Sequence, residues 1–335
     1  MVPIRGLAVH AAGAELLPFH YDPGALGAQE VEIAISHCGI CYSDLHLIAN
    51  DWGNSQYPFI PGHEVIGTVA AVGSSVHTLK EGQRVGLGWQ SNSCGECEWC
   101  TRGMENLCPK SEATCVRRNG GYAERVRANA RFVIAIPEAL DSERAAPLLC
   151  GGITVYNPLR THGVNPSSRV GVVGIGGLGH LAIQFARAFG AQVTAFSTSA
   201  GKEEEARALG AHGFVNTRET KSMKEMAGTQ DFILAAANAD QEWNTIVQTL
   251  RPTGTLCIVG VPPSPVALQA FPLISKMRTV TGSPIGSPHQ LREMLDVAAR
   301  HGVQAQTEAF PMARANEAID KVKRSRVRYR AVLAN

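Results

Sequence analysis

A glycine-rich turn at residues 174–179 limits the fold of this chain more than any other feature. It reads Gly-Ile-Gly-Gly-Leu-Gly, and it joins an apolar run at 169–173 to a segment with helical apolar spacing at 178–189. Glycines at these positions permit a tight turn and let an anion approach the backbone at a helix N-terminus. A strand, this turn and a helix in succession predict a dinucleotide-binding unit, and the alternative is an ordinary glycine-rich turn.

Strand-like and helical segments alternate throughout the region that contains this turn. Short apolar runs are separated by segments with apolar residues at helical spacing. Such alternation predicts a doubly wound parallel sheet of the Rossmann type, and we assign residues 152–285 to this cofactor domain. The expected strands are 169–173, 192–196, 214–215, 231–234 and 255–259, and the expected helices are 178–189, 202–209 and 243–250.

The chain before this region has a different pattern. Residues 1 to about 150 contain short alternating runs broken by Gly and Pro, which is typical of an all-β, barrel-like domain with long loops. A helical segment at 289–301 and an alternating run at 326–333 follow the cofactor domain, and we expect them to return to the first domain. The prediction is an α/β protein whose catalytic domain comprises residues 1–151 and 286–335, in keeping with the two domains that 335 residues suggest.

The end of the second expected strand indicates which dinucleotide binds. An acidic side chain there would hydrogen-bond the ribose 2′-hydroxyl of NAD. This chain instead has Ser197, Thr198, Ser199 and Lys202, which suit a 2′-phosphate. NADP(H) is therefore the predicted cofactor, although Lys202 has the alternative of a solvated position beside three glutamates. The expected cofactor-binding residues of the glycine turn are Gly174, Gly176, Gly177, Leu178 and Gly179.

Four of the nine cysteines are bunched in one loop, at Cys94, Cys97, Cys100 and Cys108. Four soft donors at this spacing satisfy a closed tetrahedral zinc site, in which no position is left for substrate. We predict a structural zinc ion that stiffens a long loop. An iron–sulfur cluster and a redox-switch cluster are the alternatives.

A second metal site is expected from three separate segments, which supply Cys41, His63 and Cys150. Two thiolates and one imidazole suit a zinc ion with an open fourth position, so this ion is predicted to be catalytic. Each residue alone has an ordinary alternative, since a cysteine on an apolar run is often a small buried hydrophobic residue. Cys38 competes with Cys41 for the first position.

Polar residues beside these ligands suggest supporting roles. Ser43 is expected to hydrogen-bond the substrate oxygen, and His46 to lie at the outer end of a proton path. Asp44 is expected to accept a hydrogen bond from the free ring nitrogen of His63 and so to fix its tautomer. Glu64 is expected to support the metal or to coordinate it transiently.

The motifs together carry a family resemblance that runs from residue 2 to residue 333. They are Cys38–Cys41 with Ser43 and Asp44, Tyr57–Pro58, Gly62–Glu64, the cysteine loop, Pro147–Tyr156, Gly174–Gly179, Ser197–Lys202 and Gly282–Ser287. The chain resembles the zinc-dependent medium-chain alcohol dehydrogenases, in the cinnamyl alcohol dehydrogenase-like branch, and most of all the bacterial NADPH-dependent broad-range aldehyde reductases of that branch. The resemblance implies a GroES-like catalytic domain and two zinc ions per subunit.

Further residue roles follow only from this resemblance. Thr154 would sit against the nicotinamide ring, and Val261 and Ser283 would lie where backbone groups meet the carboxamide. Trp52 and Trp89 would line the substrate pocket, with ordinary packing as the alternative. The branch usually has His after the first zinc cysteine, whereas this chain has Tyr42. A neutral phenol cannot give the same charge to the cofactor phosphates, so that contact is not carried over.

The expected activity is that of an oxidoreductase interconverting aldehydes and primary alcohols, with aromatic and medium-chain aliphatic aldehydes as substrates. The metal would polarise the carbonyl as a Lewis acid. Two alternatives remain open. One is a zinc-free quinone or enoyl reductase on the same fold, which would not need the three ligands. The other is a non-catalytic NADPH-binding redox sensor that uses the cysteine loop.

The net charge of +2 gives no reason to expect nucleic acid or an acidic membrane as a partner. The basic residues between Lys321 and Arg330 are expected on a solvated strand face. The N-terminal segment lacks a secretory h-region, which favours a cytoplasmic protein. We expect an edge strand at 277–282. Its pairing with the same strand of a second copy across a two-fold axis would form a homodimer.

Overall fold

The computed structural model describes residues 3–335, and within them the chain divides into two compact units. The first unit contains the described residues up to Cys150, together with Gly286–Ala299 and Gln304–Asn335. The second contains Gly151–Ile285 and Arg300–Val303. Each unit has its own cluster of buried apolar side chains. Within the described part of the chain, none of the helices combines the length and the hydropathy that a membrane span requires.

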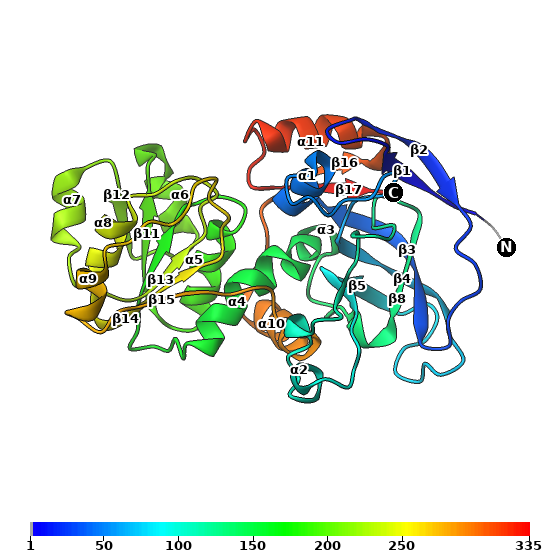
Figure 1. The fold of residues 1–335 in the computed structure, drawn as a ribbon, viewed down its shortest axis with the longest axis horizontal. Coiled ribbons are helices and arrows are strands. Elements are labelled where there is room, and N and C mark those ends of the chain that lie inside the picture. The colour runs from blue at the N-terminus through cyan, green and yellow to red at the C-terminus, as the bar shows by residue number, and fades with distance from the viewer. Residues whose placement is uncertain (1–2) are drawn as a thin grey trace. The chain divides into compact units, whose positions relative to one another are not determined.

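Strands dominate the first unit (Figure 1). They are β1 (Ile4–Val9), β2 (Leu16–Tyr21), β3 (Glu30–Gly39), β4 (Glu64–Val72), β5 (Arg84–Leu87), β6 (Gln90–Asn92), β7 (Glu112–Ala113), β8 (Arg125–Asn129), β9 (Val133–Ala135), β16 (Thr307–Pro311) and β17 (Arg330–Ala334). The helices are α1 (Tyr42–Ala49), α2 (Glu98–Thr101), α3 (Ser142–Ala145), α10 (Pro288–His301) and α11 (Ala315–Lys323), with 3₁₀ turns η1 (Glu105–Leu107), η2 (Ala130–Phe132), η3 (Ala146–Leu149) and η5 (Met312–Arg314).

The main sheet of the first unit brings the two ends of the chain together. Its order is β16, β17, β3, β4, β5 and β9, and β8 also pairs with β3. Every pair is antiparallel except β16 with β17. The register places Gly39 opposite both Glu64 and Val332. The chain that leaves β3 therefore starts beside the first residues of β4 and of the C-terminal strand.

The basic C-terminal segment does not form the solvated strand face that the sequence suggested. Lys321 and Lys323 belong to α11, and the strand begins only at Arg330, whose side chain is buried. That expectation is wrong because α11 extends to Lys323 and residues 324–329 form a turn, so that of these basic residues only Arg330 lies in the strand.

The second unit is a six-stranded sheet with flanking helices. Its strands are β10 (Arg169–Val173), β11 (Gln192–Ser197), β12 (Gly213–Asn216), β13 (Gln230–Ala235), β14 (Leu250–Ile258) and β15 (Thr279–Gly282). The helices are α4 (Gly151–Thr161), α5 (Gly179–Ala188), α6 (Glu203–Ala208), α7 (Thr220–Glu225), α8 (Trp243–Thr249) and α9 (Ala270–Ile274), with the 3₁₀ turn η4 (Ala200–Lys202). In Figure 1, α7, α8 and α9 gather on one side of this sheet.

The strand order of this sheet is β12, β11, β10, β13, β14 and β15, and all neighbours are parallel. The order reverses between β10 and β13, and ligands of such sheets bind at the carboxyl ends of the strands at that point. The glycine turn leaves β10 there. The structure confirms the predicted fold class, a β-rich domain together with a doubly wound parallel sheet.

Candidate active site

Three side chains that are far apart in the sequence meet in the first unit. Cys41 caps the N-terminus of α1, His63 directly precedes β4, and Cys150 follows η3. The two sulfur atoms lie 3.9 Å apart, and one ligand atom from each of these residues and from Glu64 lies within 4.8 Å of the others. His63 Nε2 is buried and has no hydrogen-bond partner among residues 3–335. Two sulfurs and an unpartnered imidazole nitrogen fit a zinc ion, which would satisfy that nitrogen.

Asp44 holds this arrangement together from the first turn of α1. Its Oδ1 lies 2.9 Å from His63 Nδ1 and accepts a hydrogen bond from the Gly62 N–H at 3.0 Å. Its Oδ2 accepts from the Cys41 N–H at 2.9 Å and from the Tyr122 hydroxyl at 3.3 Å. The carboxylate is fully buried, and these donors offset the cost of removing it from water. The contact with Nδ1 leaves Nε2 free to face a metal.

Burial and neighbouring groups shift the pKa values of the side chains that meet here. The Cys150 thiol hydrogen-bonds to Cys41 and lowers the pKa of Cys41 well below its usual range. Burial acts to lower the pKa of His63, but the charges of Asp44 and Cys150 raise it well above its usual range. The low pKa favours the thiolate form of Cys41, which is the form in which a cysteine binds a metal.

Glu64 stands beside these ligands and is paired with a residue that the sequence did not single out. Arg330 at the start of β17 forms a buried ion pair with Glu64 Oε1 and donates to the Ile40 carbonyl at 3.2 Å. Burial raises the pKa of Glu64 to about 8, and the Arg330 guanidinium acts against that rise. The second carboxylate oxygen, Oε2, has no hydrogen-bond partner in the described chain. The two residues are 266 positions apart in the sequence, and they meet because β17 and β4 both pair with β3, so no local pattern could reveal the contact.

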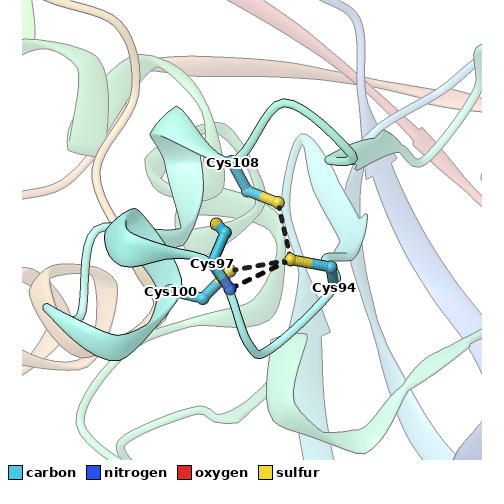
Figure 2. A group of neighbouring side chains, drawn as sticks. All are labelled: Cys94, Cys97, Cys100 and Cys108. Atoms are coloured by element: carbon cyan, nitrogen blue, oxygen red, sulfur yellow. Dashed lines mark hydrogen bonds between the residues drawn. The ribbon is translucent and has the colours of Figure 1, made fainter.

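The four cysteines of the loop also converge (Figure 2). Cys94 Sγ lies 3.5 Å from Cys108 Sγ and 3.9 Å from Cys100 Sγ, and all four sulfurs fall within 4.8 Å of one another. The backbone N–H of Cys97 donates to Cys94 Sγ at 3.4 Å. Hydrogen bonds from the backbone of Glu96 and Cys97 lower the pKa of Cys94 to about 6. Four sulfurs with N–H support fit a tetrahedral zinc ion without an open position.

The glycine turn of the second unit is shaped by close backbone approach. Gly174 has a φ of +89°, and a Cβ there would meet Ala237 at 2.8 Å. A Cβ on Gly179 would lie 1.8 Å from the Gly174 carbonyl, whereas one on Gly176 would meet nothing within 4 Å. The first and last glycines are therefore needed for packing, and the middle one leaves open space beside the helix N-terminus where a phosphate could approach. Gly177 and Leu178 complete the turn before α5.

The residues predicted to select the cofactor lie at the end of β11. The Ser197 hydroxyl is buried and accepts from the Ser199 N–H at 3.1 Å. Thr198 and Ser199 are exposed. Lys202 Nζ donates to the Ile175 carbonyl within the glycine turn. The ammonium group and the hydroxyls therefore lie close to the turn that would hold the pyrophosphate.

Comparisons with known proteins agree with this geometry. Residues 27–138 match the alcohol dehydrogenase GroES-like domain, and residues 177–300 match the zinc-binding dehydrogenase family. The aldehyde reductase AdhA of Synechocystis sp. is 45% identical over 99% of this chain and 99% of its own. The chain belongs to the zinc-dependent medium-chain alcohol dehydrogenases.

Its place in the cinnamyl alcohol dehydrogenase-like branch is supported by a cinnamyl alcohol dehydrogenase structure from Sorghum bicolor. The two have 38% sequence identity and a TM-score of 0.95, and the match covers 99% of this chain and 98% of the other. A Helicobacter pylori enzyme of that type, complexed with NADP(H), has 31% identity, a TM-score of 0.91, and coverage of 99% and 98%.

Aromatic rings form a continuous series beside the three candidate metal ligands of this dehydrogenase. The Trp89 ring meets the His63 ring edge-on, with centroids 4.8 Å apart. Trp52 meets Trp89 at 6.2 Å, and His46 stacks on Trp52 at 5.2 Å. The Trp52 side chain is 39% exposed. Both predicted pocket residues therefore lie on one apolar wall that begins at His63.

The predicted proton-path residues of the dehydrogenase lie on α1. The Ser43 hydroxyl is 3.7 Å from Cys41 Sγ. His46, one turn later, has its Nδ1 2.7 Å from Asp51 Oδ2, within hydrogen-bond distance. Tyr42 is exposed, with its ring 6.3 Å from that of His46. The structure thus places one hydroxyl beside the sulfur of Cys41 and an imidazole farther along the same helix.

Two further cysteines lie near the candidate metal ligands of the dehydrogenase, in different surroundings. Cys38 is buried on β3, with its thiol 3.7 Å from the Gly39 carbonyl, and it lies outside the group that could hold a metal. Cys115, which the sequence gave no reason to single out, has its sulfur 3.9 Å from both His63 Nδ1 and Asp44 Oδ1. It packs behind the imidazole, and only the tertiary structure shows that position.

The three residues that the resemblance placed at the nicotinamide lie in the second unit. Thr154 is half-buried in α4. The Val261 N–H donates to Asn238 Oδ1 at 3.1 Å, and the Val261 side chain is exposed. The Ser283 hydroxyl accepts from Asn157 Nδ2 at 3.3 Å and donates to the Pro284 carbonyl at 3.1 Å.

Proposed function

We propose that the protein is an aldehyde reductase that interconverts aldehydes and primary alcohols with NADP(H) and a zinc ion held by Cys41, His63 and Cys150. The observation that carries this proposal is the meeting of two sulfurs with the buried, unpartnered Nε2 of His63. The name of the Synechocystis relative, an aldehyde reductase, supports the substrate class.

The metal ion and the cofactor would supply the Lewis acid and the reductant. A zinc ion at the three ligands would act as a Lewis acid toward the substrate oxygen, and NADPH would supply the hydride. Asp44 keeps the His63 proton on Nδ1, so that Nε2 stays free for the metal. The Ser43 hydroxyl beside Cys41 can pass a proton to or from the substrate oxygen. His46 can exchange that proton with water, since its side chain is partly exposed. Glu64 adds a carboxylate oxygen that can approach the metal transiently.

The preference for NADP(H) over NAD(H) is proposed from Ser197, Thr198, Ser199 and Lys202. The support is the hydroxyl and ammonium groups near the glycine turn, together with the H. pylori relative described as complexed with NADP(H). A Ser197→Asp variant would place a like charge near a 2′-phosphate and should move the ratio of kcat/KM values toward NADH. An unaltered ratio would refute the assignment.

The roles of the two domains, the second zinc ion, the oligomeric state and the cellular setting are also proposals. We assign catalysis to residues 1–151 and 286–335 and cofactor binding to residues 152–285, with a second, structural zinc at the four cysteines of the loop. A homodimer is supported by β15, which lies at one edge of its sheet, near the exposed apolar side chains of Phe271, Ile274 and Met277. A cytoplasmic, reducing setting is supported by nine free cysteines.

A metal assay and a substrate panel test the proposal. The protein should contain two zinc ions per chain and reduce benzaldehyde and medium-chain aliphatic aldehydes with NADPH, and ketones poorly. A chelator that removes the catalytic zinc should abolish this activity. Retained aldehyde reduction in the zinc-free protein would favour a zinc-free quinone or enoyl reductase, and a lack of turnover in the zinc-loaded protein would favour a redox sensor.

A further inference from the structure

We propose that the cysteine loop braces the substrate pocket: Gln90 and Thr114, at the two ends of the loop, hold Trp89 against His63 and so determine which aldehydes fit. This inference rests on the proposed function, because it takes Trp89 as part of the pocket wall. It gives the loop a role in specificity in addition to stability. Gln90 and Thr114 are positioning residues, since they would act through Trp89.

Trp89 has a direct link to the candidate metal ligands. Its ring meets the His63 ring at 87° and 4.8 Å. The residue before it, Gly88, packs so closely on the Leu149 carbonyl that a Cβ on Gly88 would lie 2.5 Å from that oxygen. Leu149 directly precedes Cys150. The backbone that carries Trp89 therefore touches the neighbour of one ligand while its ring touches another.

The backbone of Trp89 is fixed by the segment that follows the last cysteine of the loop. The Trp89 carbonyl accepts from the Thr114 N–H at 2.7 Å, and the buried Thr114 hydroxyl donates to the Gly88 carbonyl at 2.6 Å. The pairing of β6 with β7 places Gln90 opposite Ala113. Both peptide groups that flank Trp89 are thus held by residues 113–114.

The side chain of Gln90 ties the same point to the middle and the end of the loop. Its Nε2 donates to the Glu105 carbonyl at 2.8 Å and to the Ser111 hydroxyl at 2.7 Å. Gln90 is buried, and a buried amide with both donor hydrogens used holds its backbone firmly. Glu105 is itself anchored by an ion pair with Arg131. The loop between Cys94 and Cys108 thereby fixes the position of Trp89 from a second direction.

A pair of near-isosteric variants tests the brace. Gln90→Met keeps the side-chain length but removes both donors, so Trp89 should lose its fixed position. We expect the ratio of kcat/KM for benzaldehyde to kcat/KM for hexanal to fall about tenfold, mainly through the KM of benzaldehyde, because an aromatic substrate depends most on the ring wall. Asn92 lies two residues along the same strand and donates to Glu112 Oε1 at 3.1 Å. The control, Asn92→Leu, should leave the ratio within about twofold of the wild-type value.

A double-variant comparison identifies Trp89 as the group through which Gln90 acts. On a Trp89→Leu background, Gln90→Met should not change the ratio further. An equal change on both backgrounds, or an unchanged ratio in Gln90→Met alone, would overturn the proposal. If Gln90→Met does not fold, Ser111→Ala takes its place in the test. This variant, at an exposed position, removes one of the two acceptors of the Gln90 amide and should lower the kcat/KM ratio about threefold.

A readout without turnover separates this inference from the proposed function. The contribution of Trp89 to the near-ultraviolet circular dichroism is the difference between the wild type and Trp89→Leu. That contribution should shrink in Gln90→Met and persist in Asn92→Leu. A wild-type protein that reduces neither aldehyde would refute the proposed function, whereas an unchanged Trp89 signal in Gln90→Met would refute the brace.

Discussion

The two groups of residues in the first unit that could hold a metal ion are built in opposite ways. Cys94, Cys97, Cys100 and Cys108 come from one loop, and backbone N–H groups of the same loop support their sulfurs. Cys41, His63 and Cys150 come from three segments, and side chains that are distant from His63 in the sequence support its ring. Asp44 and Tyr122 stand behind the imidazole.

The difference in construction corresponds to a difference in chemistry. Four sulfurs close the coordination of a tetrahedral ion, so the loop site is suited to holding structure. Two sulfurs and one nitrogen leave a position open, and a surrounding network of buried charges can tune what occupies it. We therefore expect changes in the three-segment site to affect activity more than stability, and changes in the loop site to do the reverse.

The largest expected effect is that of His63→Ala. The variant removes the imidazole that faces the metal, so kcat/KM for benzaldehyde should fall by at least about 10³-fold. The zinc content should fall from two ions to one. Loss of a buried imidazole that pairs with Asp44 should also lower the free energy of unfolding by about 2 to 3 kcal/mol, which is less than the loss of transition-state stabilisation. Activity and zinc are measured on the same preparation, with His20→Ala, an exposed histidine on β2, as the control. An active variant would remove the distinction between the two sites.

Cys100→Ala should show the opposite pattern. Cys100 is a buried member of the loop cluster, and its loss should release the loop zinc and lower the free energy of unfolding by about 3 kcal/mol. Chemical denaturation followed by circular dichroism measures this change. Cys257→Ala, a buried cysteine outside both clusters, serves as the matched control. A stability equal to that of the control would mean that the loop needs no metal.

The contrast also explains how much the sequence could predict. The cysteine loop and the glycine turn were recognisable because their functional residues are neighbours in the chain. Grouping Cys41, His63 and Cys150 depended on residue type, because three distant segments share no local spacing. Arg330 was misread as part of a solvated face because its partner, Glu64, lies on another strand of the sheet, and strand pairing cannot be derived from either segment alone.

Asp44→Asn should have an intermediate effect. The amide keeps the shape of the side chain but loses the charge and presents N–H groups to some of the donors around it. We expect the affinity for the catalytic zinc to fall about 10- to 100-fold, measured by competition with a chelator, while the loop zinc is retained. Asp51→Asn changes an exposed carboxylate paired with His46 and should leave zinc affinity unchanged. Loss of both ions from Asp44→Asn would show that the two sites are not independent.

The smallest expected effect is that of Cys115→Ala, which examines whether the support of His63 is electrostatic or a matter of packing. The sulfur lies 3.9 Å from both His63 and Asp44, and the side chain is buried. Deleting one buried atom of this size should cost about 1 kcal/mol of unfolding free energy. If Asp44 alone orients the imidazole, zinc affinity should change less than about threefold. A loss as large as that of Asp44→Asn would mean that close packing behind His63 matters as much as its hydrogen bond, and the three-segment site would then depend on shape as well as on charge.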